Sequence, residues 1–101
     1  MGDLLAAVIR LKIQTYYDIL VAIHVIRKAG RGATLYSVAR RVGLPHNRLK
    51  SRLGELRGLG LVDPDYAVTE KGYAFCGDYQ RHIVPVLLKY GICLTVVEAA
   101  E

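Results

Sequence analysis

The segment from Thr34 to Val62 constrains the fold most, because it contains two helical patterns separated by a glycine turn. In its first half, apolar residues recur at spacings of three and four, which predicts a short amphipathic helix with Thr34 as its N-cap. Gly43 is expected to end that helix. The second half repeats the period, and this predicts a second helix from about Pro45 to Leu59. The apolar positions of the two helices are Leu35, Val38, Ala39, Val42, Leu49, Leu53, Leu56 and Leu59.

The face of the second helix opposite its leucines is polar and low in profile. Asn47, Ser51, Gly54 and Gly58 share this face on a helical wheel, and basic residues flank it on both sides. Short amide and hydroxyl groups can meet base edges, and cations at the margins can meet phosphates. The alternative is a solvated helix whose glycines have no function. We favour a helix that contacts DNA bases, here called the reading helix. Each interior glycine destabilises a helix by about 1 kcal/mol relative to alanine, so glycines at these positions call for a functional reason.

Positive charge is concentrated on the same segment. Residues 27–57 carry nine basic residues and one acid, Glu55, for a net charge of +8, whereas the rest of the chain has a net charge of −3. Such a concentrated field favours a polyanionic partner. The predicted DNA-binding residues are Arg31, Ser37, Arg40, Arg41, His46, Asn47, Arg48, Lys50, Ser51, Arg52 and Arg57.

The length of 101 residues predicts one domain, with an N-terminal arm (1–14), a core (15–81) and a C-terminal helix end with an apolar tail (82–101). Apolar residues make up 52% of the chain, more than a lone domain of this size readily buries, so we expect some of this surface to meet a partner. The start MGDLLAAVIR lacks the basic segment of a secretory signal, and no apolar run is long enough to span a bilayer. We therefore expect a soluble, cytoplasmic protein.

Cysteines and histidines do not form a recognisable site. Cys76 and Cys93 lack C-x-x-C spacing, and the three histidines are scattered, so we expect no metal and favour free thiols over a disulfide. Gly30-Arg31-Gly32 lacks the preceding strand that a phosphate-binding glycine loop requires, which argues against a nucleotide cofactor. Few Asn, Gln and Met residues beside many Arg, Val and Ile suggest a thermophilic source.

Before the central segment, helix and strand patterns compete over Asp3 to Ile13, and we favour a helix. The pattern Thr15-x-x-Asp18 predicts the start of a helix that runs to about Ala29 and ends at Gly30. This helix is apolar on nearly every side, so it requires cover from the N-terminal arm or from a second subunit. His24 within it is expected to be a core histidine rather than a ligand.

After the central segment, Gly60 to Val62 and Tyr66 to Val68 are expected to pair as a short antiparallel wing. Its turn residues are Asp63, Pro64, Asp65 and Tyr66. Thr69 should then cap a helix that Pro85 kinks or splits, and Ile92 to Val97 form a β-prone apolar hexamer. The predicted fold class is therefore mainly α with a small two-stranded β wing (α+β). The helical stripe predicted to form the dimer contains Phe75, Tyr79, Ile83, Val86, Leu87 and Tyr90.

Over about residues 15–81, this order of elements resembles the winged helix-turn-helix superfamily. The resemblance is carried by Gly43-Leu44, Leu49-Lys50, Gly60-Leu61-Val62 and Val68-Thr69-Glu70-Lys71-Gly72. It is closest to small archaeal winged-helix regulators and chromatin-associated proteins that dimerise through a C-terminal helix. The resemblance implies a homodimer with two reading helices. The chain departs from the pattern of this superfamily at two places. Pro45 stands where the cap of the reading helix is usually Ser or Thr, and the wing turn is acidic where a wing that contacts DNA is basic.

These patterns predict a nucleoid-associated protein that binds double-stranded DNA as a transcriptional regulator or chromatin protein. We expect no catalytic activity, because the carboxylates are scattered and no histidine has an evident acid or nucleophile partner. The alternative is a winged-helix module for protein–protein interaction within a larger complex, which the acidic wing turn fits. The operator sequence and any small-molecule effector do not follow from the residues.

Overall fold

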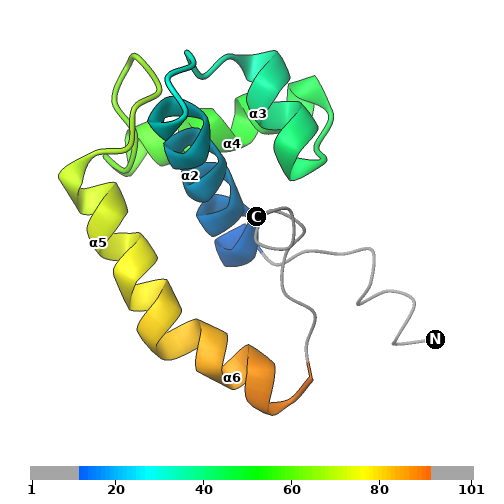
Figure 1. The fold of residues 1–101 in the computed structure, drawn as a ribbon, viewed down its shortest axis with the longest axis vertical. Coiled ribbons are helices and arrows are strands. Elements are labelled where there is room, and N and C mark those ends of the chain that lie inside the picture. The colour runs from blue at the N-terminus through cyan, green and yellow to red at the C-terminus, as the bar shows by residue number, and fades with distance from the viewer. Residues whose placement is uncertain (1–11, 92–101) are drawn as a thin grey trace.

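The computed structural model describes residues 12–91 and is mainly helical (Figure 1). Three helices form one end of this part: α2 (Lys12–Lys28), α3 (Leu35–Val42) and α4 (His46–Gly58). The chain then continues as α5 (Glu70–Asp78), a π-helical turn η1 (Tyr79–Ile83) and α6 (Val84–Lys89). Figure 1 shows α5 to α6 as a curved column beside α2. The predictions for residues 1–11 and 92–101, including the apolar hexamer, lie outside the described residues.

The predicted pair of helices around Gly43 is confirmed. The Thr34 side chain accepts a hydrogen bond from the Ser37 amide, and the Ser37 side chain accepts one from the Thr34 amide, so a capping box starts α3. Gly43 ends α3 in the left-handed conformation (φ 82°), which glycine adopts without strain. Pro45 precedes α4, and Leu49, Leu53 and Leu56 of its leucine stripe are buried. Leu59, the fourth predicted member of the stripe, is instead 48% exposed and lies just after the helix.

The predicted start of α2 is wrong. Thr15 and Asp18 do not cap this helix, because α2 already includes Lys12 and both side chains are buried within it. The pattern of these two residues is compatible with a helix start or a helix interior, and both side chains are buried in α2, which packs against α3, α4 and α5. His24 is also not a core residue: its side chain is exposed, and its Nδ1 lies 3.0 Å from the Tyr73 hydroxyl.

The predicted two-stranded wing is wrong, and within residues 12–91 the structure contains no strand. Only an isolated antiparallel bridge joins Val62 and Val68. The Asp63 carboxylate accepts hydrogen bonds from the amides of Asp65 and Ala67, and Tyr66 has a left-handed backbone (φ 60°). These local bonds hold the segment as a compact turn, so its backbone does not extend into a ladder. The helical part of the predicted class is correct.

The column from α5 to α6 agrees with the predicted capped helix interrupted near Pro85. Thr69 caps α5 by accepting a hydrogen bond from the Gly72 amide. Proline lacks an amide proton, and its ring collides with the carbonyl four residues earlier in a regular α-helix. The chain instead forms the π turn just before Pro85, in which the Val84 amide donates to the Tyr79 carbonyl.

Two hydrophobic clusters hold these helices together. The larger one joins α2, α3, α4 and the segment after α4; its buried members are Ile19, Leu20, Ala22, Ile23, Ile26, Val38, Ala39, Val42, Leu49, Leu53, Leu56, Leu61 and Val62. The smaller one joins α2 to η1 and α6 through Tyr17, Tyr79 and Leu87. In it the Tyr17 and Tyr79 rings stack with their centroids 4.1 Å apart, and the Gln80 amide donates to the Tyr17 hydroxyl.

Candidate nucleic-acid interface

The outer face of α4 is the most evident candidate site. Burial of Leu49, Leu53 and Leu56 in the larger cluster turns the opposite side of the helix toward solvent. The exposed residues of α4 are His46, Asn47, Arg48, Lys50, Ser51, Gly54, Arg57 and Gly58. Three of them are cations and none is an acid, so this face combines positive charge with short polar side chains.

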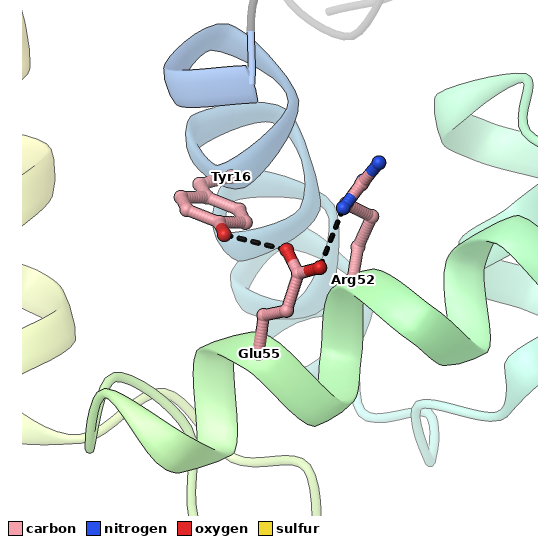
Figure 2. A network of polar contacts seen from close by, with 3 residues as sticks. All are labelled: Tyr16, Arg52 and Glu55. Atoms are coloured by element: carbon pink, nitrogen blue, oxygen red, sulfur yellow. Dashed lines mark hydrogen bonds and ion pairs between the residues drawn. The ribbon is translucent and has the colours of Figure 1, made fainter.

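The one acid of α4 lies away from this face, in a polar network with α2 (Figure 2). The Tyr16 hydroxyl donates to one Glu55 oxygen at 2.6 Å, and the Arg52 guanidinium donates to the other at 2.6 Å. These two hydrogen bonds lower the pKa of Glu55, so its carboxylate stays ionised at neutral pH. The same bond from Tyr16, together with burial, raises the pKa of that hydroxyl.

This network changes the predicted role of Arg52. Its side chain is only partly exposed and is held in an ion pair with Glu55. Arg52 therefore pairs within α4 with the same carboxylate that binds Tyr16 of α2, and it is not grouped with Arg48 and Lys50. The pairing offsets the charge of Glu55 beside the candidate face.

Asn47 has a structural contact that sequence reasoning missed. Its side-chain oxygen accepts a hydrogen bond from the Arg48 amide at 2.8 Å. Pro45 offers no side-chain cap, so Asn47 satisfies one of the free amides in the first turn of α4. The Asn47 side-chain NH₂ group remains on the exposed face. Removing this side chain is therefore expected to disturb the start of α4 as well as any contact with a ligand.

Gly54 and Gly58 leave the middle of the face bare. A Cβ atom built on either residue would meet nothing within 4 Å, and neither has a positive φ. Neither the packing nor the backbone conformation of the described residues requires glycine at these positions. The two glycines give the helix a flat strip that another surface can approach closely.

The remaining predicted contacts are divided between exposed and engaged side chains. Arg40 on α3 and Arg31 in the loop before it are exposed, whereas Arg41 is half-buried. Ser37 is used in the capping box of α3. Of the other cations in the basic segment, Arg27 donates to the Asp65 carbonyl at 2.7 Å, which fastens the turn after α4 to the end of α2.

Tyr36 is a candidate that the sequence analysis missed. Its side chain is 62% exposed on α3, and its ring centroid lies 6.1 Å from that of His46 at the start of α4. Together with Arg40 and Gly43, these rings line an open cleft of about 380 Å³ between the two helices. Tyr36 does not belong to the apolar stripe of α3, and this position in the sequence pattern already indicated that its side chain is exposed.

The residues predicted for the wing turn and for the dimer interface include both buried and exposed side chains. Asp63 uses its carboxylate within the turn, Pro64 and Asp65 are exposed, and Tyr66 packs against the larger cluster. In the helical stripe, Tyr79 and Leu87 are buried in the smaller cluster, and Phe75 and Ile83 pack against it. Val86 and Tyr90 are exposed, as is Leu88, which the stripe did not include.

Other kinds of site lack support among the described residues. The structure places no group of three or more His, Cys, Asp or Glu residues within residues 12–91 where they could hold a metal ion. In the same range, no helix is long and apolar enough to cross a membrane. Cys76 is a free thiol, and burial raises its pKa to about 11, so it is protonated and unreactive at neutral pH. No family model, curated protein or solved structure matches this chain.

Proposed function

We propose that this protein binds double-stranded DNA through the outer face of α4, as a non-catalytic transcriptional regulator or architectural protein of the nucleoid. The observation that carries the proposal is the composition of that face. Its exposed cations Arg48, Lys50 and Arg57 surround a strip of small and polar residues, and its only acid is turned away and paired. An α-helix fits the major groove of B-form DNA, where short polar side chains reach base edges.

The neighbouring helix supports the same placement. Arg40 and Tyr36 project from α3 beside the start of α4, and Arg31 lies in the loop before α3. In a helix-turn-helix protein the second helix enters the groove while the first crosses the DNA backbone. Arg40 and Arg31 would then contact phosphates, and the Tyr36 hydroxyl could donate to one.

We further propose that the protein acts as a homodimer that presents two copies of α4. The apolar side chains of α6 and of the residue just after it support this arrangement, because Val86, Leu88 and Tyr90 are 50%, 62% and 69% exposed. In Figure 1, α6 lies at the opposite end of the molecule from α3 and α4, so pairing there would leave both reading helices accessible. Burial of such side chains stabilises an interface by about 25 cal/mol per Å² of apolar surface.

Removal of the cations on α4 is expected to reduce the electrostatic part of DNA binding. Arg48→Ala and Lys50→Ala should each weaken binding to all duplex sequences alike. Each lost phosphate contact should lower the slope of log affinity against log salt by about 0.9, and a dimer loses two contacts. The measurement is fluorescence anisotropy with a labelled duplex over a series of salt concentrations. Lys89→Ala is the matched control, because it removes the same charge from the distant helix α6.

The same titration separates the two functions considered from the sequence. Reduced slopes in both α4 variants and an unchanged slope in Lys89→Ala would support DNA binding through this face. Wild-type protein that fails to bind duplex DNA even at low salt would contradict the proposal. That result would leave a protein-interaction role for the exposed surface.

The dimer is tested by sedimentation of the full chain. At a protein concentration on the order of 50 µM, far above the dissociation constant of a stable dimer, we expect a mass of two chains. Leu88→Glu should shift the protein to monomers without unfolding it, because this side chain is mostly exposed. His82→Glu, an exposed substitution on η1, is the control and should remain dimeric. A wild-type monomer at this concentration would rule out the dimer.

A further inference from the structure

A second surface feature lies at the base of α4, away from its outer face. It is a groove of about 610 Å³ bounded by the first turns of α2, the segment just after α4, and α5. Its apolar lining is formed by Ile13, Tyr16, Leu59, Leu61, Ala74 and Phe75. Small-molecule sites have volumes of this order and are lined mainly by apolar and aromatic side chains.

The charges at the groove favour an anion. Lys12 and Lys71 line it from α2 and α5. The Lys71 ammonium donates one hydrogen bond to the Leu59 carbonyl at 2.8 Å, which leaves two of its three donors for a ligand. Among the described residues that line the groove, the one acid is Asp78, and it forms an ion pair with Arg81 that offsets its charge.

We propose that this groove binds a small amphipathic carboxylic acid, with its hydrocarbon part against Leu61 and Phe75 and its carboxylate between the two lysines. An uncharged apolar molecule would leave the lysines unused, and a cation would face two like charges. An acid of this kind satisfies both the apolar lining and the positive rim. The bound acid would lie against the end of α4. The lining residue Leu59 directly follows Gly58, the last residue of that helix, and the lining residue Tyr16 donates a hydrogen bond to Glu55 of α4.

The probe for this site is octanoate, added to the full-length protein in the absence of DNA. Two-dimensional ¹H–¹⁵N spectra should show saturable shifts at the amides of Leu61, Ala74 and Phe75, and a dissociation constant of about 1 mM or lower is expected. Octylammonium carries the same alkyl chain with the opposite charge. It should bind at least several-fold more weakly, because it would face Lys12 and Lys71.

Variants of the groove test both parts of the contact. Lys12→Met and Lys71→Met should each weaken octanoate binding by roughly three- to fivefold, the range of an exposed ion pair. Ala74→Trp places a large ring in the groove and should abolish the shifts, and because Ala74 is exposed the fold should tolerate it. Lys89→Met, which removes a lysine of α6, should bind octanoate as the wild type does.

Three results would overturn the proposal. The first is the lack of a saturable shift at these amides up to about 10 mM octanoate. The second is equal affinity for octanoate and octylammonium. The third is a set of nuclear Overhauser contacts that places residues of this chain or of a second copy in the groove of the wild-type protein. None of these measurements involves DNA, so their outcome is independent of whether α4 binds a duplex.

Discussion

Replacement of Gly72 by alanine is expected to destabilise the protein by about 3 kcal/mol, at the upper end of the usual effect of overpacking. Gly72 is buried in the first turn of α5, where a Cβ atom would lie 2.3 Å from the Leu61 carbonyl oxygen and 2.7 Å from a Val68 methyl group. The oxygen belongs to the backbone and cannot rotate away. The alanine variant must therefore separate α5 from the segment that follows α4.

Urea denaturation at one fixed protein concentration measures this effect, since the stability of a dimer depends on concentration. Gly77→Ala is the matched control in the same helix, because the nearest atom to its added Cβ is the flexible Arg81 side chain at 3.5 Å. The control should be as stable as the wild type or more stable by up to about 1 kcal/mol. A Gly72→Ala variant within 1 kcal/mol of the wild type would show that the close approach is not rigid.

Replacement of Gly54 and Gly58 by alanine is expected to separate stability from DNA binding. Each substitution should stabilise α4 by about 1 kcal/mol, because alanine is the better helix former and its methyl group has open space here. The same methyl groups would stand between the helix and the base edges. We therefore expect the double variant to bind DNA at least about tenfold more weakly, a loss of about 1.4 kcal/mol.

The measurements are urea denaturation and anisotropy on the same protein preparation. Gly77→Ala serves again as the control, because it changes a helical glycine on α5 and should leave DNA affinity unchanged. A double variant that is more stable and binds DNA as tightly as the wild type would mean that the bare strip does not contact DNA. Equal losses in the variant and the control would point to a general effect of altered stability.

The helices α3 and α4 were predictable from sequence because the interactions that define them are local. The Thr34–Ser37 capping box spans four residues, Gly43 supplies the left-handed end, and the leucine period of α4 matches one helical face. The exposure of Asn47, Ser51 and the two glycines follows from the same period. A helical wheel describes such features without any knowledge of the rest of the fold.

Sequence patterns were less reliable where a local signal competed with packing or side-chain bonds. The pattern from Thr15 to Asp18 resembles a cap, yet both residues lie inside α2. The apolar triplets around Pro64 resemble paired strands, yet Asp63 binds the amides of Asp65 and Ala67 and holds a turn instead. In both cases the residues are compatible with two structures, and the surrounding contacts select one of them.

Only the tertiary structure determined which charged and apolar side chains remain available. Glu55 pairs with Arg52 and also binds Tyr16, which lies 39 positions before it in the chain, and Tyr79 stacks on Tyr17 across a still larger separation. The groove between α2 and α5 and the close approach at Gly72 likewise join distant segments. Periodicity and capping describe neighbours along one helix, whereas these contacts depend on how separate helices pack, and a pattern of three or four residues carries no information about that packing.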